Sequence, residues 1–253
     1  MASVKVQGLL LLLLSAVLLL SISPTGSEVV KAVDKCSEFF LDGTPPNIPG
    51  VLENGNIQDQ NRYKNKIPVF SASRYTGGDG GKRKKSWKIE PQAGDIDYKD
   101  QKPYTRGHLL PSSYGLDKKA MFSLTNIVPQ IGSFNSGSWK NMEKCVKCVM
   151  DKFCIDNNGN IDAFVVIGAE PGNTLLNSRV NIPSKMWTAF CCYSNSQNRW
   201  LASAHWGENR EEEKVHHLQT KTLAELSAEL GKQFDLFRGT QCPLDTTKCQ
   251  ATH

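Results

Sequence analysis

The chain carries a histidine, an asparagine and a glutamate whose types and order suit chemistry on an anionic substrate: His108, Asn135 and Glu143. His108 is the only histidine before residue 205, and it lies in the segment TRGHLLPSSYG. A neutral imidazole accepts a proton from water near pH 7, because its reference pKa is about 6.5. The amide oxygen of Asn135 is an uncharged, hard ligand that suits Mg²⁺, which takes few protein ligands. The two residues predict a general base and a metal ligand.

A helix is predicted to follow Asn135 and to carry an acid and a cation. From Ser138 onward, apolar residues recur every three or four positions, as on one buried helix face: Trp139, Met142, Val146, Val149 and Phe153. Glu143 then lies about 7.5 Å along the axis from the helix start, too far to share a ligand shell but suited to hydrogen-bonding metal-bound waters. Lys147, one turn later, is expected to pair with Glu143 or to face a phosphate.

Hydrolysis of a phosphodiester is the reaction that fits such a set. A base positions and deprotonates the attacking water, while a metal ion and cationic side chains hold the charge that builds on the oxygens. Taken singly, each residue has a simpler interpretation: a structural histidine for His108 and a helix cap for Asn135. Their order and spacing together favour catalysis.

The same residues form a long gapped motif that resembles the DNA/RNA non-specific endonucleases, and most closely their secreted vertebrate branch, the endonuclease domain-containing 1 proteins. The family pattern is Asp-Arg-Gly-His, then Thr/Ser-Asn-x-x-Pro-Gln, then Asn-x-Gly-x-Trp-x-x-x-Glu. It stands here as TRGH at 105–108, TNIVPQ at 125–130 and NSGSW at 135–139, with Glu143 four residues further on. The segment KSWKIEP at 85–91 resembles an upstream family segment, and the resemblance covers roughly residues 62–230.

The resemblance implies a role for each matching residue. His108 would be the general base, Asn135 the protein ligand of Mg²⁺ or another divalent cation such as Mn²⁺ or Ca²⁺, and Glu143 an anchor for the waters of that ion. Arg106, Lys85 and Lys147 would neutralise phosphate charge, and Asn126 and Gln130 would support the site or contact the substrate.

One position departs from the family pattern. Thr105 stands where the family has the aspartate that opens the Arg-Gly-His motif. A threonine still donates and accepts a hydrogen bond, but it removes a negative charge from near the metal. The expected consequence is weaker metal affinity or slower turnover. A nuclease-fold protein that binds nucleic acid or other polyanions without cleaving them therefore remains the alternative.

The elements that must position these residues belong to an α+β domain. Apolar or β-branched runs bounded by turn residues predict strands at 67–76, 86–91, 122–130, 162–171, 186–194 and 199–206. Besides the helix from Ser138, a second is predicted from the acidic run 211–213 to Gly231. Strands and helices do not alternate regularly, so we expect a central antiparallel sheet flanked by helices. The ββα-metal (His-Me finger) unit that the resemblance implies would place His108 at a strand end and Asn135 at a helix start.

The N-terminal residues and the cysteines indicate export. Residues 1–27 resemble a signal peptide, with Lys5 ahead of the apolar run 9–20, which is too short to span a bilayer. Residues 28–253 are then expected to form one secreted domain without stable membrane association. All eight cysteines follow the leader, an even number that predicts disulfides but permits 105 pairings.

The charge pattern is mild but uneven. A net charge of +5 does not by itself mark a nucleic-acid binder, although the basic block Lys82–Lys85 is a candidate for phosphate contact. DNA, with RNA as an open second substrate, is the expected partner. A secreted protein that binds acidic glycans through this block is a further alternative.

Overall fold

The computed structural model describes residues 32–53, 56–57, 65–78, 95–99, 101–114, 126–231 and 234–245. The predicted leader, the strand at 86–91, the basic block with Lys85, Thr125 and Cys249 lie outside the described residues.

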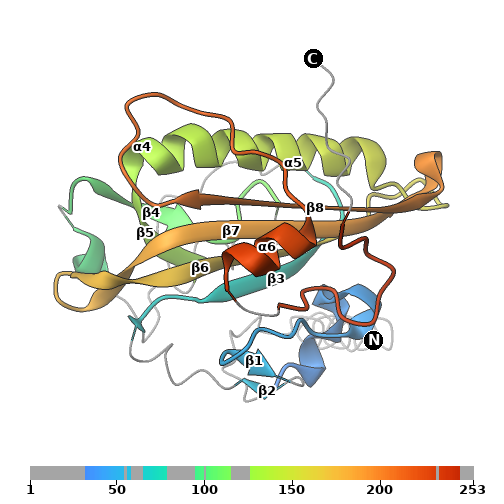
Figure 1. Ribbon diagram of the computed structural model, residues 1–253, viewed down its shortest axis with the longest axis horizontal. Coiled ribbons are helices and arrows are strands. Elements are labelled where there is room, and N and C mark those ends of the chain that lie inside the picture. Colours follow the sequence, from blue (N-terminus) through green and yellow to red (C-terminus); the bar gives the residue numbers. More distant parts are fainter. Residues whose placement is uncertain are drawn as a thin grey trace, which may run out of the picture. The chain divides into compact units, whose positions relative to one another are not determined.

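A four-stranded antiparallel sheet forms the centre of the described chain, with the strand order β3-β6-β7-β8 (Figure 1). Its strands are β3 (Phe70–Tyr75), β6 (Ala163–Leu176), β7 (Val180–Ser194) and β8 (Arg199–Glu208). Each includes most of a predicted strand, because alternating or continuous apolar residues suit a sheet that is buried on its faces. The expectation of an antiparallel central sheet is confirmed.

The sheet separates two hydrophobic clusters, and β7 shows how its sequence supplies both. Alternate residues point to opposite faces of a strand. Met186, Phe190 and Cys192 therefore enter one cluster, while their neighbours Trp187, Ala189 and Cys191 enter the other. Two disulfides follow the same alternation, because Cys192 is bonded to Cys154 and Cys191 to Cys242. Each disulfide therefore links the inner strand β7 to a segment that lies on one face of the sheet.

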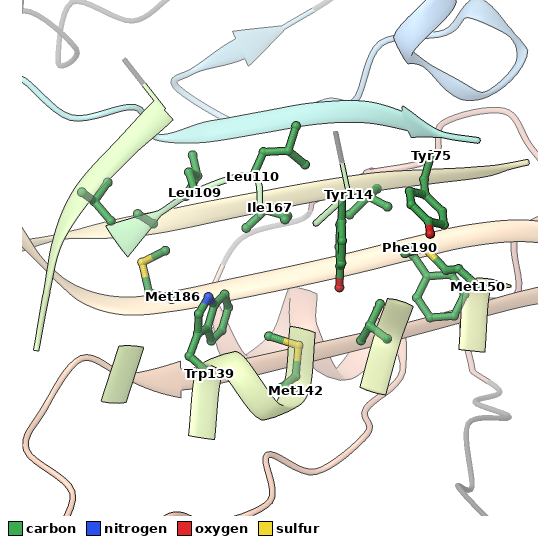
Figure 2. Packing of buried hydrophobic residues seen from close by; sticks show 14 of the residues in the cluster. Tyr75, Leu109, Leu110, Tyr114, Trp139, Met142, Met150, Ile167, Met186 and Phe190 are labelled. Atoms are coloured by element: carbon green, nitrogen blue, oxygen red, sulfur yellow. The ribbon is translucent and has the colours of Figure 1, made fainter. Parts of the chain in front are cut away.

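The long helix α5 (Lys140–Phe153) covers the first face. Its residues Met142, Val146, Val149 and Met150 are buried, and Trp139 directly before it is 1% exposed. Figure 2 shows Trp139, Met142 and Met150 directed toward Met186, Phe190 and Ile167 of the sheet. The predicted apolar stripe is confirmed.

The other face is covered by segments from both ends of the chain. The N-terminal part contributes the 3₁₀ helices η1 (Asp34–Phe39) and η2 (Leu41–Gly43) and the small hairpin of β1 (Leu52–Glu53) and β2 (Asn56–Ile57). The C-terminal part contributes α6 (Leu223–Glu229), whose Leu226 is fully buried. Further 3₁₀ turns are η3 (Asp95–Tyr98), beside the site described below, and η6 (Asn195–Gln197), between β7 and β8.

The helix predicted from residue 211 is wrong in its first half. Residues 209–221 have no helical structure, and α6 begins only after Thr222, whose side chain forms a capping box with Glu225. A capping box satisfies two backbone N–H groups at the start of a helix. The sequence at 211–213 provides negative charge but no such capping box. The predicted end is confirmed, because Gly231 has a φ of +62° directly after the last helical turn.

A second, two-stranded sheet and a helical segment carry the candidate residues. β4 (Tyr104–His108) pairs antiparallel with β5 (Ile127–Ile131), and the chain turns directly from β5 into the helical segment. This segment consists of α4 (Gly132–Phe134), a π-helical turn η5 (Asn135–Trp139) and α5. The helical segment begins at Gly132, six residues before the start that was predicted near Ser138. Asn135 therefore lies inside it, with φ −59° and ψ −45°, rather than before it.

A buried histidine in β8 makes the stability of the fold depend on pH. His205 is 4% exposed, and burial lowers its pKa to about 4, against a smaller opposing effect of the backbone at Leu218 and Gln219. Between about pH 4 and pH 6.5, His205 is therefore protonated in the unfolded chain, where its pKa is about 6.5, but not in the folded chain. Stability should therefore fall as the pH decreases from about 6.5 to about 4, by about 3 kcal/mol in all.

Urea unfolding of wild type and His205→Gln between these pH values checks this expectation. The loss of stability with falling pH should be clearly smaller in the variant. Equal slopes in the two proteins would show that His205 does not control the acid response.

Candidate active site

The β4–β5 hairpin explains why a glycine lies next to His108. Gly107 pairs with Val128, and Gln130 points to the same face of the hairpin. A Cβ atom on Gly107 would lie 2.2 Å from Cδ of Gln130, whose side chain is fully buried. Only glycine allows this close approach. The Gln130 side chain thus packs against the β4 backbone at Gly107 and does not reach the surface.

His108 is fixed at the last position of β4. It pairs with Ile127, and the next two residues, Leu109 and Leu110, point into the core (Figure 2). The carboxamide of Asn126 clamps the following backbone, since Oδ1 accepts from the Leu110 N–H at 2.9 Å and Nδ2 donates to the Leu110 carbonyl at 3.0 Å. Asn126 therefore positions the strand end that carries His108. Its expected contact with substrate gains no support from this geometry.

The imidazole of His108 is partly exposed, although its Nε2 atom is buried. Arg106 and His108 share a face of β4, because they are two residues apart.

Asn135 is held against β4 by Thr105. The Thr105 hydroxyl donates to the backbone carbonyl of Gln130 at 3.1 Å and accepts from Nδ2 of Asn135 at 3.0 Å. Because its only proton is used toward Gln130, this hydroxyl selects the amide nitrogen of Asn135 as its partner. The hydrogen bond thus orients the carbonyl oxygen of Asn135 away from Thr105. That oxygen is the atom that a hard cation requires.

The loop at 209–221, which was predicted to be partly helical, stabilises the π-helical turn around Asn135. Glu212, with a side chain only 6% exposed, accepts hydrogen bonds from the Ser138 hydroxyl at 2.8 Å and from the Ser138 N–H at 3.3 Å. The Ser138 hydroxyl in turn accepts from the backbone N–H of His216 at 2.8 Å. No local pattern signals this role, because residues 138 and 212 are distant in sequence.

Glu143 lies on α5, half-buried, with its backbone carbonyl accepting from the Tyr114 hydroxyl at 2.7 Å. Burial raises the pKa of its carboxyl group to about 8, while Trp139 and Lys140 act in the opposite direction. Asn135 precedes Glu143 by eight residues, and the helical segment is kinked between them, because Gly137 has the non-helical angles φ −99° and ψ −112°. A regular helical spacing therefore does not describe this pair.

The cationic residues expected near the site differ in their surroundings. The Arg106 guanidinium lies over the ring of Tyr98 in η3, with 5.8 Å from its central carbon to the ring centroid. Lys147 is engaged elsewhere, because its ammonium donates to Asp151 at 2.6 Å and lies over the ring of Tyr75. The expected pair with Glu143 is therefore replaced by a pair with Asp151, whose side chain is 36% exposed. Lys85 lies outside the described residues.

The donor set fits a hydrated divalent cation. The described residues contain no group of three or more His, Cys, Asp or Glu side chains arranged to hold a metal. The amide oxygen of Asn135 would be one hard ligand, and the partly buried carboxylate of Glu143 would be stabilised in its charged form by a nearby cation.

The structure thus places an antiparallel strand pair, with a histidine at the end of one strand, directly before a helical segment that carries an asparagine. The chain belongs to the DNA/RNA non-specific endonuclease family, whose sequence model matches residues 37–240.

Individual relatives agree with this assignment. The chain is 25% identical over 199 residues to the human endonuclease domain-containing 1 protein, and 27% identical over 199 residues to the mouse protein. Each alignment covers 62% of this chain, but only 39% of the human and 38% of the mouse protein, so the chain spans about two fifths of their length.

The fold is also that of a solved nuclease. The structure of EndoG in complex with EndoGI, a study of the mechanism of EndoG inhibition, superposes with a TM-score of 0.59. The match covers 85% of this chain and 96% of the other at 15% sequence identity, and therefore concerns the fold alone.

In the described part of the chain, no helix is both long and apolar enough to cross a membrane.

Proposed function

We propose that the protein is a secreted, metal-dependent endonuclease that hydrolyses DNA, and as a second substrate RNA, with little sequence preference. The observation that carries the proposal is the hydrogen bond between Thr105 and Asn135, which ties a metal-binding amide to the strand that also holds Arg106 and His108. The family assignment supports nuclease chemistry in general, and these residues supply the parts that the chemistry needs.

The reaction is a displacement at phosphorus. The imidazole of His108 accepts a proton from a water as the water oxygen attacks, and the bond from phosphorus to the leaving oxygen breaks. Arg106, held by Tyr98, neutralises phosphate oxygens. A divalent cation, when bound, supplies further positive charge for the oxygens that become more negative. Asn135 would hold that cation through its amide oxygen, and Glu143 would accept hydrogen bonds from the waters bound to it.

Supercoiled plasmid is the substrate that tests this proposal. Wild type should nick and linearise it in Mg²⁺ or Mn²⁺, and EDTA should stop the reaction. Fragment ends without a preferred sequence are expected, because contacts to phosphates carry no sequence information. Intact plasmid in Mg²⁺, Mn²⁺ and Ca²⁺ alike would remove the catalytic claim.

The alternative, a nuclease fold that binds polyanions without cleaving them, is favoured by Thr105 in place of an acid. Retention of a DNA duplex or heparin together with intact plasmid would support it.

Export is part of the proposal. Residues 1–27 act as a cleaved leader, and residues 28–253 form one domain that leaves the cell. The two disulfides support an oxidising destination, although Cys145 and Cys148 on the exposed side of α5 are unpaired. N-terminal sequencing of protein secreted from a eukaryotic host should begin at Glu28. A start at Met1 would contradict the leader.

Thr105 is expected to control metal affinity through Asn135. Thr105→Val removes the hydrogen bond to Nδ2, worth about 1 kcal/mol, and should raise the Mg²⁺ concentration for half-maximal cleavage by roughly fivefold to tenfold. Thr105→Ser keeps the hydroxyl and should remain close to wild type. Titration of Mn²⁺ by electron paramagnetic resonance measures the same affinity without catalysis. Equal affinities of the valine and serine variants would contradict this role.

A further inference from the structure

A second arginine, remote in sequence from the motif, lies beside the residues that hold Arg106. Nε of Arg179 contacts Oδ1 of Asp97 at 2.9 Å. Asp97 is the neighbour of Tyr98 in η3, and Tyr98 carries the Arg106 guanidinium over its ring. The two arginines therefore attach to adjacent residues of one short helical turn.

The surroundings of Arg179 orient it without burying it. The Asp97 side chain is 1% exposed, whereas that of Arg179 is 54% exposed. A buried carboxylate thus holds one edge of the guanidinium, and much of the side chain stays accessible to solvent. A guanidinium has five N–H donors in a fixed plane, so donors remain for a phosphate after it binds one carboxylate oxygen.

The backbone that carries Arg179 is also anchored to η3. Arg179 lies in the turn between β6 and β7, where Asn177 and Ser178 have φ values of +50° and +56°. Nδ2 of Asn177 donates to the Asp97 carbonyl at 3.1 Å. In Figure 1 this turn lies at the same end of the sheet as β4, β5 and α4. Both the side chain and its turn are therefore fixed beside the hairpin that carries the candidate catalytic residues.

We propose that Arg179, held by Asp97, binds a backbone phosphate of the nucleic acid next to the phosphate that Arg106 contacts. This inference rests on the proposed function and extends it, since it adds a binding residue that the family motif does not contain. The contact recognises charge and geometry and is independent of base sequence.

Arg74 provides a matched control. Its side chain is 48% exposed, similar to that of Arg179, and its Nε contacts Asp162 at 2.7 Å, although Asp162 is 28% exposed and therefore less buried than Asp97. It lies at the other end of β6, since Arg74 pairs with Phe164 near the start of that strand, whereas Arg179 follows its end. Replacing either arginine with alanine removes one positive charge, but only Arg179 is close to the site.

Fluorescence anisotropy with a short labelled DNA duplex, in a His108→Ala background with Mg²⁺, measures binding while cleavage is suppressed. One phosphate contact releases about 0.9 counterion, which favours binding up to about eightfold at about 0.1 M salt. Arg179→Ala should therefore raise Kd by up to roughly eightfold. It should also lower the slope of log K against log salt by about 0.9, while Arg74→Ala stays within about twofold of the background protein.

Arg179→Ala leaves the buried Asp97 without its cationic partner, which could destabilise the fold. A second variant therefore controls for a loss of stability. The double variant Asp97→Asn/Arg179→Ala removes both charges, and its thermal unfolding should match the background protein. It should show the same loss of affinity and salt slope. Equal Kd and slope in the Arg179→Ala and Arg74→Ala proteins would overturn the inference and leave the proposed nuclease intact. Failure of the background protein to bind the duplex would overturn both.

Discussion

Replacing His108 with alanine is expected to lower the rate of plasmid cleavage by roughly 100-fold to 10,000-fold, because a positioned general base contributes a factor of that size. The fold should survive, since the imidazole is partly exposed and the strand end is held by Leu109, Leu110 and Asn126. DNA binding should change little, as the imidazole carries no necessary charge. The measurement is the initial rate of nicking at saturating Mg²⁺.

Two controls separate loss of a base from loss of structure. His217→Ala removes an exposed histidine from the loop after β8 and should leave the rate within about twofold. Added imidazole should partly restore a His108→Gly protein, since a small base can occupy the space that the side chain leaves. A His108→Ala protein that cleaves at the wild-type rate would exclude this residue as the base.

The second large effect is expected at Asn135. Asn135→Ala removes the only protein ligand that we assign to the cation, and the maximal rate should fall at least about 100-fold. The Mg²⁺ concentration for half-maximal activity should rise as well. Asn135→Asp keeps an oxygen ligand and adds a charge, so it should retain measurable metal binding. Calorimetric titration with Mn²⁺ detects the loss of the ion directly.

Asn141→Ala is the matched control on the same helical segment, because Asn141 is exposed on α5 and occupies a position that the motif leaves unspecified. It should bind Mn²⁺ and cleave DNA as wild type does. If Asn135→Ala binds Mn²⁺ with unchanged affinity, the cation lies elsewhere and the convergence of His108 and Asn135 on one ion is refuted.

Much of the fold was accessible to prediction, because strand and helix periodicities are local properties of a sequence. The apolar runs at 162–171 and 186–194 correspond to β6, from its first residue Ala163, and to β7, and the stripe from Trp139 to Phe153 lies on the last residue of η5 and on α5. Boundaries were less accessible. Asn135 and Ser138 suit a helix start by type, yet the chain turns from β5 straight into α4, which no turn residue other than Gly132 announces.

The acidic run at 211–213 shows the same limit more strongly. Three glutamates suit a helix N-terminus electrostatically, and on that ground a helix was expected there. Glu212 is instead used by tertiary structure, as a buried acceptor for Ser138. The helix begins where a complete capping box is present, at Thr222 and Glu225.

The sequence by itself determined which chemistry is available: a base, an amide oxygen, an acid and an arginine in an order that matches one nuclease family. It also determined the strands and the long helix, through periodicity. Only the tertiary structure decided which groups meet. Thr105 forms a hydrogen bond with Asn135, Gln130 fills the space beside Gly107, and Lys147 pairs with Asp151. Arg179 and Arg106 contact the adjacent residues Asp97 and Tyr98 of η3. Such pairs depend on how the elements pack, and sequence spacing carries no record of that packing.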